Sequence, residues 1–450
     1  MPKASDAVPE STVQLAARLA RNAVDCLPAG GLPAKLWEAE SQGRRLRVKL
    51  GIDPTAPDIH LGHAVVLRKL REFQDAGHVV VLIVGDYTAR VGDPSGRSSQ
   101  RPVLSAEEIE ANAITFHAQA FKILHPDPEL LDMRRNSEWL DMPTAELLQL
   151  LGTTTAAQLL ERDDFAKRWS GGQPISMLEL LYPMLQAYDS VAVDADVELG
   201  GTDQKFNLLL GRDVQRAYRK PEQAILTMPI LVGIDGHRKM SKSLGNQIGI
   251  TDTPDEMFGK TMSIPDEAIA EYRSLLLDGP AAPGLGAPGP AAPGSASQGA
   301  STSEAAAAGQ APAGEGGAPR AGSVESSVAG VAARDAKRAL ARELVAWLHS
   351  PEAAALAEQQ FERVHVERVA PDDVEEARFD ADGDGLLHLP RVISEAFGIS
   401  RAEARRLIDA GGVTLGDTRL QAGEHDVAVE RADGSLLKVG RRRFRRLRVR

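Results

Sequence analysis

The sequence predicts an α/β fold whose core is a doubly wound sheet of parallel strands, on the evidence of three neighbouring segments. Residues 45–49 alternate charged and apolar side chains, as a half-buried strand does, and a Gly/Pro turn follows at 51–58. Residues 64–76 carry apolar side chains at helical spacing, and Gly77 ends that helix. Residues 79–87, VVVLIVGDY, are a continuous β-branched run, typical of a strand buried on both faces. A strand, a helix and a strand in this order form the crossover unit of a Rossmann-like domain.

Length and composition limit the class of protein. The chain has 450 residues, enough for two or three domains with their own cores. No apolar run approaches the roughly 18–20 residues that span a bilayer, and the N-terminal segment mixes both charge signs, so we expect neither a membrane anchor nor a secretory signal. The single cysteine, Cys26, excludes an internal disulfide framework and a thiolate-built metal site. A cytoplasmic protein is therefore expected.

The segment between the first strand and the first helix contains two histidines. His60 and His63 are three residues apart, which puts both imidazoles on one helical face, and Gly62 between them would let a nucleotide approach closely. A strand that leads into a helix N-terminus is where such sheets bind phosphate. By themselves, two histidines near a helix start are more often helix caps or surface residues, so the rest of the chain must decide.

The segments before and after this unit are assigned next. Residues 11–42 have a helical apolar stripe and are expected to be a helical lead-in to the core. Residues 88–101, directly after the second strand, should form a tight loop that holds Asp93, Arg97 and Arg101. The arginines could bind phosphate and the carboxylate a substrate amine, because ligand groups gather at the carboxyl ends of strands. The alternative is a surface turn with solvated side chains.

The middle of the chain is expected to be helical. Residues 105–166 are mainly helical in pattern, with a strand at 133–140 that brings Asn136 and Trp139 to its end. Residues 176–190 form a helix on which Tyr182, Gln186 and Asp189 make one polar stripe. That stripe is either an exposed face or the lining of a pocket for a polar, aromatic small molecule.

Two further strand ends contain polar residues on glycine-rich loops. A short strand within 193–207 leads to Gly200, Gly201, Asp203 and Gln204, where a ligand could touch the backbone and the carboxylate could bind ribose hydroxyls. An apolar strand at 224–234 leads into a loop with Lys239 and Lys242. Two ammonium groups on a loop of small residues could clamp a polyphosphate, and a solvated turn is the alternative.

The C-terminal part changes character twice. Residues 280–330 are dominated by Gly, Pro, Ala and Ser and are expected to be a disordered insertion within a helical domain. DADGDG at 380–385 begins like a calcium loop, but its twelfth position is Arg391, so calcium is rejected. Two short helices and several strands should follow.

Arginines make this last segment basic although the whole chain has a net charge of −11. Its second helix carries Arg401, Arg405 and Arg406, and seven of the last ten residues are Arg. Such a patch is an electrostatic footprint for phosphate, with a solvated cationic tail as the alternative. Phe444, Leu447 and Val449 interleave with the terminal arginines, which predicts a strand with one packed face.

Five motifs together resemble the class I aminoacyl-tRNA synthetases, and specifically the bacterial tyrosyl-tRNA synthetases: HLGH at 60–63, GDPSGR at 92–97, YPMLQAYD at 182–189, GGTDQ at 200–204 and KMSKS at 239–243. The similarity spans 45–275 and resumes near 330, and the C-terminal segment resembles the small α+β S4-like RNA-binding domain of that family. The implied domains are a Rossmann-like catalytic domain at 1–232 with a helical insertion at about 105–175, a KMSKS loop and α-helical domain at 233–379, and the S4-like domain at 385–450.

The resemblance implies an activity and a role for each motif residue. The activity is ATP-dependent activation of L-tyrosine and its transfer to tRNA(Tyr), with Mg²⁺ arriving on the ATP, no metal bound by the protein itself, and a homodimer as the assembly. Phosphate and ATP contacts are implied for Thr55, His60, Gly62, His63, Arg97, Arg101, Gly201, Asp203, Lys239 and Lys242. Tyrosine contacts are implied for Asp93, Tyr182 and Gln186 at the ammonium, Gln204 at the carboxyl end and Asp189 at the phenolic hydroxyl. tRNA contacts are implied for Arg401, Arg405, Arg406, Arg441, Arg442, Arg443 and Arg445.

One position departs from the pattern of many family members. Lys49 stands where they place a tyrosine that also contacts the substrate hydroxyl. Strand alternation puts Lys49 on the same side as Gly51 and Asp53, so we hypothesise that it pairs with Asp189 or lies beside it, as a further tyrosine-binding residue. The alternative is a lysine that points to solvent.

Two competing functions remain open. Tryptophanyl-tRNA synthetases share the fold and the HLGH and KMSKS signatures, and Asp189 together with the S4-like segment argues against them. A non-catalytic RNA-binding regulator built on a synthetase scaffold is disfavoured because all charged signature positions are present. We also expect the helical region 105–170 to contribute to the dimer interface.

Overall fold

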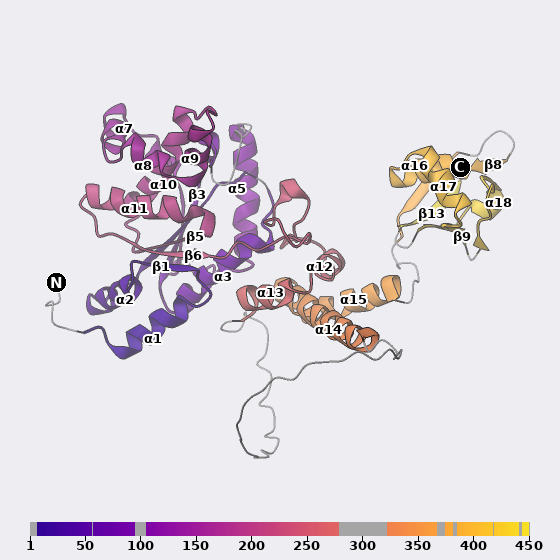
Figure 1. Cartoon of the computed structure of the whole chain (residues 1–450), viewed down its shortest axis with the longest axis horizontal. Coiled ribbons are helices and arrows are strands. Elements are labelled where there is room, and N and C mark those ends of the chain that lie inside the picture. The colour runs from indigo at the N-terminus through magenta and orange to yellow at the C-terminus, as the bar shows by residue number, and fades with distance from the viewer. Residues whose placement is uncertain are drawn as a thin grey trace, which may run out of the picture. The chain divides into compact units, whose positions relative to one another are not determined.

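The fold is taken from a computed structural model of the chain (Figure 1). It describes residues 7–55, 57–94, 105–278, 322–366, 374–380, 385–416, 418–440 and 443–449. The chain divides into two units, Met1–Ser350 and Pro351–Arg450, and each is described by itself.

A six-stranded sheet forms the centre of the first unit, in the order β1-β6-β5-β2-β3-β4. Its strands are β1 (Asp25–Leu27), β2 (Arg47–Ile52), β3 (Val79–Val84), β4 (Leu131–Arg135), β5 (Val197–Gly201) and β6 (Ala224–Met228). All neighbouring pairs are parallel except β1 with β6. The strand order runs outward from β2 to β4 on one side and from β5 to β6 on the other. The predicted doubly wound parallel sheet is confirmed, and its order reverses between β2 and β5.

Helices cover both faces of this sheet (Figure 1). On one face lie α1 (Glu10–Leu19), α2 (Gly31–Ser41) and α3 (Leu61–Asp75), and on the other lie α10 (Met177–Ala192) and α11 (Lys205–Ala217). The strands β3 and β6 are buried along almost their whole length, as expected for a sheet covered on both faces. The apolar side of α3, including Leu67, Leu70 and Phe73, is buried, and the helix packs against β3 and β5.

Three local predictions need correction. The lead-in at 11–42 is not one helix, because α1 and α2 are separated by β1, and Gly30 at the start of α2 takes a left-handed φ of 73° that suits glycine. The strand predicted at 79–87 ends at Val84. The loop expected at 88–101 begins with a short helix, α4 (Thr88–Val91), and residues 95–101 lie outside the described residues.

The helical region around residues 105–175 agrees with expectation. It contains α5 (Ala106–Ala120), α6 (Ser137–Leu140), α7 (Thr144–Leu151), α8 (Ala156–Leu160) and α9 (Asp163–Ser170). The predicted strand at 133–140 is β4, which ends earlier, and Asn136 and Trp139 follow it directly. Both residues therefore stand at the carboxyl end of a sheet strand, as the sequence indicates.

The first unit continues through a loop into further helices. The 3-10 turn η1 (Thr202–Gln204) follows β5, and the 3-10 turn η2 (Lys242–Leu244) lies in the loop after β6. This loop leads to α12 (Pro254–Thr261), α13 (Ala268–Leu276) and α14 (Gly322–Leu348). Most of the expected disordered insertion, residues 279–321, lies outside the described residues. Helix α14 begins at Gly322, so the end of the stretch predicted to be disordered, 322–330, is helical.

The second unit contains helices and small sheets. Its elements are α15 (Pro351–Phe361), the π-helix η3 (Glu362–Val366), β7 (Glu376–Phe379), β8 (Leu386–His388), α16 (Leu389–Phe397), α17 (Arg401–Asp409), β9 (Val413–Leu415), β10 (Thr418–Arg419), β11 (Asp426–Ala428), α18 (Val429–Ala432), β12 (Leu436–Val439) and β13 (Arg443–Val449). Strands β10-β9-β12-β13-β7 form one sheet and β11-β8 a second. The two predicted helices, α16 and α17, contribute Val392, Ile393 and Ile408 to one apolar core.

The terminal strand differs from the prediction in one respect. Leu447 and Val449 of β13 pack into the apolar core, but Phe444 does not belong to that cluster. Phe444 stands opposite Lys438 in the register and lies 5.3 Å below its ammonium group. Because side chains alternate along a strand, positions 444 and 447 face opposite sides. The prediction of a single packed face is therefore wrong. Of the acidic segment at 380–385, residues 381–384 lie outside the described residues.

Candidate active site

Polar side chains gather where the strand order of the sheet reverses. Strands β2 and β5 are neighbours there, and the segments that follow them contain Asp53 and the stretch from Gly201 to Gln204. In open α/β sheets, ligands bind outside the carboxyl ends of the strands at this reversal. The segments after β3 and β4 add Asp93 and Asn136 to the same edge of the sheet.

The HLGH and KMSKS motifs, far apart in sequence, lie next to each other. The backbone of Ile59 to Leu61 pairs with 248–250: the Leu61 N–H donates to the Ile248 carbonyl at 2.9 Å, and the Ile250 N–H to the Ile59 carbonyl at 3.0 Å. A β-carbon at Gly62 would come within 3.7 Å of the Met240 β-carbon and 3.0 Å of the His60 ring. Glycine at position 62 therefore allows the two motifs to pack in direct contact.

The two histidines are stacked and uncharged at neutral pH. Their ring centroids are 4.0 Å apart and the ring planes differ by 28°. Burial lowers the pKa of His63 to about 4. Burial, and then the charges of His63 and Lys239, lower the pKa of His60 to about 2. The His60 backbone N–H donates to Nδ1 of His63 at 3.4 Å, so the proton of that neutral ring is on Nε2. A neutral imidazole N–H of this kind can donate to a phosphate oxygen.

The KMSKS lysines are each held by a carboxylate. Lys239 Nζ lies 3.5 Å from Asp203 Oδ2, and Lys242 Nζ donates to Asp58 Oδ2. Both lysines are about half exposed, with side-chain exposures of 48% and 47%. Such exposed pairs are weak, typically below about 1 kcal/mol. An arriving polyphosphate can therefore displace the carboxylates at little cost.

Asn246 anchors the loop that carries these lysines. Its side-chain oxygen accepts from the Ser241 N–H at 2.8 Å, and its amide nitrogen donates to Asp235 Oδ2 at 3.0 Å and to the Lys239 carbonyl at 3.1 Å. The side chain is buried at 2% exposure. The loop backbone is thus positioned while the lysine side chains remain at the surface.

The polar stripe on α10 faces inward. Tyr182 and Asp189 are buried, at 6% and 3% exposure, and Gln186 between them is half-buried. The Tyr182 hydroxyl donates to Asp53 Oδ2 at 2.9 Å, and the Thr88 hydroxyl donates to the other oxygen, Oδ1, at 2.6 Å. Of the two interpretations of this stripe, the exposed face is excluded.

The Asp189 carboxylate lies at the inner end of the stripe. Oδ1 accepts from the indole N–H of Trp139 at 2.8 Å, and Oδ2 faces the amide nitrogen of Asn136 at 3.5 Å. Burial raises the pKa of Asp189 to about 6, against the lowering effects of Lys49, Trp139 and Asn136. A carboxylate that burial makes costly to ionise, with donors on both oxygens, is suited to accept one more hydrogen bond from a buried hydroxyl.

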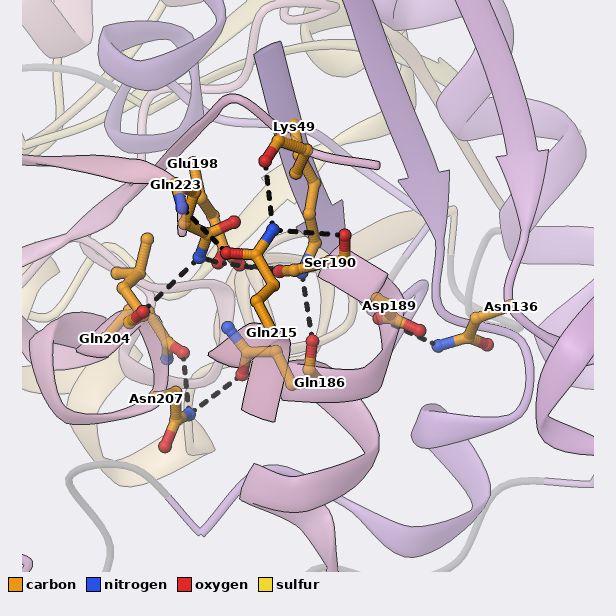
Figure 2. Close-up of polar contacts among 12 residues, drawn as sticks. Lys49, Asn136, Gln186, Asp189, Ser190, Glu198, Gln204, Asn207, Gln215 and Gln223 are labelled. Carbon is orange, nitrogen blue, oxygen red and sulfur yellow. Dashed lines mark hydrogen bonds and ion pairs between the residues drawn. The ribbon is translucent and has the colours of Figure 1, made fainter. Parts of the chain in front are cut away.

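Lys49 does not pair with Asp189, and it does not point to solvent. Its ammonium forms an ion pair with Glu198 Oε1 at 2.8 Å and donates to the Ser190 hydroxyl at 2.8 Å and the Gln186 carbonyl at 2.9 Å. The side chain is fully buried, and Figure 2 shows its contacts with Glu198 and Ser190. Its ammonium contacts Ser190, the residue after Asp189, and affects the Asp189 carboxylate only through its charge. The predicted pairing is wrong because Glu198 on the adjacent strand β5 is the nearer buried anion.

The Asp93 and Gln204 side chains meet in a network with Asn207. Gln204 Nε2 donates to Asp93 Oδ2 at 2.9 Å, and Asn207 Nδ2 donates to Gln204 Oε1 at 3.0 Å and to Gln186 Oε1 at 2.8 Å (Figure 2). Arg162, from the segment between α8 and α9, reaches this network from the other side. The predicted amino-acid contacts Asp93 and Gln204 are thus directly bonded, and Gln186 is linked to them through Asn207.

The remaining predicted residues fall into three groups. Thr55, in the loop after β2, is half-buried. A β-carbon at Gly201 would lie 2.7 Å from Asp203 Oδ1, so glycine at this position lets the Asp203 carboxylate fold back over the end of β5. Arg97 and Arg101 lie outside the described residues, as do Arg441 and Arg442. Of the predicted tRNA contacts in the second unit, Arg401, Arg405, Arg406 and Arg443 are exposed.

Arg445 differs from these, because it has partners within its own unit. It pairs with Glu375 at 2.8 Å and lies over the Phe397 ring at 5.4 Å.

Sequence reasoning missed four residues of the site. Asp53 stands in the turn after the first strand, where a carboxylate directly beyond a strand end is a recognisable signal. Glu198, Asn207 and Arg162 carry no such signal, because their partners come from segments distant in sequence.

Comparison with known proteins agrees with this geometry. The profile of the class I tRNA synthetases for tryptophan and tyrosine matches residues 41–282. A tyrosine–tRNA ligase of Moorella thermoacetica is 46% identical over 95% of this chain and 94% of its own length, and one of Thermotoga maritima is 43% identical over 98% of both. The crystal structure of a C-terminally truncated mitochondrial tyrosyl-tRNA synthetase of Aspergillus nidulans shares the fold, with a TM-score of 0.57 at 21% identity over 79% of this chain and 94% of that one.

In the described part of the chain, no helix has the length and apolar character needed to cross a membrane. The profile match and the near full-length relatives, together with the histidine, lysine and tyrosine-helix motifs at one sheet edge, establish the family. The chain belongs to the tyrosyl-tRNA synthetase family of the class I aminoacyl-tRNA synthetases.

Proposed function

We propose that the chain activates L-tyrosine with ATP, forming tyrosyl-adenylate and pyrophosphate, and then transfers tyrosine to the 3′ end of tRNA(Tyr). The observation that carries the choice of amino acid is the buried Asp189 carboxylate, held by Trp139 and Asn136. Tyrosine–tRNA ligases of two bacteria are 46% and 43% identical to this chain over nearly its whole length.

Recognition of the phenol follows from the cost of leaving Asp189 without a partner. Tyrosine donates its hydroxyl to the carboxylate, whereas phenylalanine would bury the same carboxylate against an apolar ring edge. Enzymes of this family are themselves the usual illustration of such discrimination. Tryptophan offers an indole N–H at a different distance from the amino-acid backbone, so the same carboxylate disfavours the tryptophanyl alternative.

The other end of the amino acid is bound by residues on three segments. Asp93, Tyr182 and Gln186 hold the ammonium, and Gln204 faces the carboxyl end. This division is supported by the contacts among these side chains and by the match in charge between an acidic network and a cation. Lys49 is not included, because its ammonium is occupied by Glu198, Ser190 and the Gln186 carbonyl.

Activation requires no covalent enzyme intermediate. The tyrosine carboxylate attacks the α-phosphate of ATP in line, and positioning with charge stabilisation accounts for the rate. The neutral N–H of His63 and the neighbouring His60 bind phosphate oxygens, and Lys239 and Lys242 leave their carboxylates to stabilise the departing pyrophosphate. Thr55, Arg97 and Arg101 complete this set. Mg²⁺ enters with ATP and neutralises part of its charge.

Asp203 binds the ribose hydroxyls, next to the close-approach positions Gly62 and Gly201. A carboxylate accepts from both hydroxyls of a ribose, and the absence of side chains at these two positions lets nucleotide and backbone meet. In the free enzyme Asp203 is paired with Lys239, so ATP binding exchanges that contact for ribose and phosphate contacts.

The second unit binds tRNA as an S4-like domain. Its exposed arginines on α17, Arg401, Arg405 and Arg406, and the exposed Arg443 on β13 supply cations for phosphate. Arg441 and Arg442 are assigned to the same surface from the sequence. Arg445 contributes less, because Glu375 and Phe397 already occupy its guanidinium.

The chain acts as a homodimer through its 105–170 region. Large apolar side chains that are exposed in this region are Ile114, Phe121, Leu148, Leu151 and Trp169, and the exposed Met177 and Leu178 follow it closely. A monomer rarely exposes so many large apolar groups in one region without a partner. Light scattering at micromolar concentration should give the mass of two chains, and a monomer there contradicts this part of the proposal.

ATP–pyrophosphate exchange measured with each amino acid tests the proposed activity. Exchange that depends on tyrosine, followed by tyrosylation of tRNA(Tyr), supports it. Exchange driven by tryptophan would favour the other branch of the family, and binding of tRNA without any exchange would favour a non-catalytic regulator.

A further inference from the structure

Arg162, Asn207, Gln204 and Asp93 form a closed ring of polar contacts, in which three hydrogen bonds are completed by an ion contact between Arg162 and Asp93. Arg162 Nη1 donates to Asn207 Oδ1 at 3.1 Å, and the Arg162 guanidinium also lies 3.7 Å from Asp93 Oδ1. Asn207 donates to Gln204, and Gln204 donates to Asp93. Asn207 is 1% exposed and the Arg162 side chain 5% exposed, so water does not compete for these positions.

The direction of every hydrogen bond in this network follows from its two charged ends. A guanidinium can only donate, so the Asn207 group facing Arg162 must be its oxygen. Both N–H groups of Asn207 then point away, toward Gln204 and Gln186. At the other end a carboxylate can only accept, so the Gln204 group facing Asp93 must be its nitrogen. Asn207 requires the Gln204 oxygen to face it, and Asp93 requires the Gln204 nitrogen to face it, so both requirements are met by one orientation of the Gln204 amide.

The same argument orients Gln186, which lies on α10 (Figure 2). Because an Asn207 N–H faces it at 2.8 Å, the Gln186 group in contact is its oxygen, Oε1. A carbonyl oxygen has two lone pairs, so Oε1 keeps one for a ligand. The Tyr182 hydroxyl donates its hydrogen bond to Asp53, which likewise leaves oxygen lone pairs available on Tyr182.

We propose that Asn207 and Arg162 are positioning residues for the amino-acid site: they fix the orientations of the Gln186 and Gln204 amides, so that Gln186 presents its oxygen acceptor to the substrate ammonium. An ammonium group has three N–H donors and no acceptor, so an amide turned the other way would repel it. The inference rests on the proposed function, in which Asp93, Tyr182 and Gln186 bind the tyrosine ammonium. It adds residues that touch no substrate and act through Gln186 and Gln204.

The decisive variant is Asn207→Asp, which keeps the size of the side chain but removes both N–H donors. Its carboxylate would accept from Gln186 and Gln204, so both amides turn their nitrogens toward it, and the Gln186 oxygen leaves its position. A new ion pair with Arg162 would strengthen this arrangement.

The test compares L-tyrosine with desaminotyrosine, which keeps the phenol and the carboxylate but has no ammonium. Dissociation constants are measured by calorimetry for the full-length wild type and for each variant. We expect Asn207→Asp to weaken tyrosine binding by about tenfold or more, and desaminotyrosine binding by less than about twofold. Gln215→Glu is the matched control, because Gln215 lies on the same helix, is 1% exposed and donates to the Ala195 carbonyl. It should leave the ratio of the two affinities unchanged.

A second pair of variants keeps the test informative if Asn207→Asp folds poorly. Arg162→Met removes the donor that orients Asn207, and Arg162→Lys retains a cation that can only donate. We expect the methionine variant to lose selectivity for tyrosine over desaminotyrosine, and the lysine variant to retain more of it.

Equal weakening of both ligands by Asn207→Asp, or no weakening of either, would overturn the inference. A wild type that binds tyrosine and desaminotyrosine equally well would instead contradict the proposed ammonium site.

Discussion

Lys49 and Glu198 form an ion pair between adjacent strands of the central sheet, with 2.8 Å between Nζ and Oε1 and side-chain exposures of 0% and 1%. The pair is supported by Ser190, whose hydroxyl accepts from Lys49 and donates to Glu198 at 3.1 Å, and by Gln223. Lys49 also holds the Gln186 carbonyl, and so connects the sheet to the helix that carries the tyrosine contacts. A buried pair of this kind is a structural element behind the site.

We expect Lys49→Met to lower the free energy of unfolding by about 3–5 kcal/mol, because Glu198 would remain buried without its counter-charge. The double variant Lys49→Met with Glu198→Gln should recover most of that loss. Chemical denaturation followed by tryptophan fluorescence measures both. Lys220→Met, which breaks the exposed pair with Asp194, is the control and should cost less than about 1 kcal/mol. If Lys49→Met is as stable as Lys220→Met, this account is contradicted.

Tyrosine binding should depend on pH through Asp189. Burial raises the pKa of this carboxyl to about 6, so its ionised fraction in the free enzyme increases from pH 5 to pH 7. Because the ionised form accepts the phenolic hydrogen bond, kcat/KM for tyrosine should rise by about tenfold over that interval and then level off. Pyrophosphate exchange at limiting tyrosine measures the profile.

Phenylalanine provides the control substrate for this prediction. It has no hydroxyl to donate, so its kcat/KM should stay flat or fall as Asp189 ionises. Asp189→Asn should flatten the tyrosine profile. A rise of equal size for both amino acids would assign the ionisation to another group.

The histidines should act as neutral donors. Since the pKa values of His60 and His63 are lowered to about 2 and about 4, kcat at saturating tyrosine and ATP should be flat between pH 6 and pH 8. His63→Ala should lower kcat by on the order of 100-fold, whereas His63→Gln, which retains a neutral N–H donor, should lower it less. An inflection near pH 6.5 that disappears in His63→Ala would show instead that a charged imidazole takes part.

The contact between Lys242 and Asp58 should compete with ATP. Asp58→Asn removes the carboxylate that holds Lys242 in the free enzyme, so the KM for ATP should fall by about two- to fivefold, in line with the small strength of an exposed pair. Asp194→Asn, which breaks an exposed pair with Lys220 away from the lysine loop, is the matched control and should change nothing. An unchanged or higher KM in Asp58→Asn would mean that the carboxylate does not oppose ATP binding.

Local patterns were sufficient for much of the fold. The apolar run at 79–84 and the helical spacing after His63 depend on neighbours in the chain, and both predicted elements are present. The turn predicted after the first strand is present, because turn chemistry is local. The strands predicted at 79–87, 133–140 and 224–234 end earlier than expected, at Val84, Arg135 and Met228. The prediction of a helical lead-in over 11–42 is wrong at β1, because β1 pairs with β6. These two segments are about 200 residues apart, and such a pairing leaves no periodic signal in the sequence.

The sequence by itself determined which motifs this protein carries and the type of sheet that presents them. Only the tertiary structure decided that Lys49 pairs with Glu198 and not with Asp189, and that Arg162 and Asn207 orient the amides of the site. The physical reason is that a buried charge or amide takes the partner that packing brings within hydrogen-bond distance, and packing is set by how distant helices and strands meet.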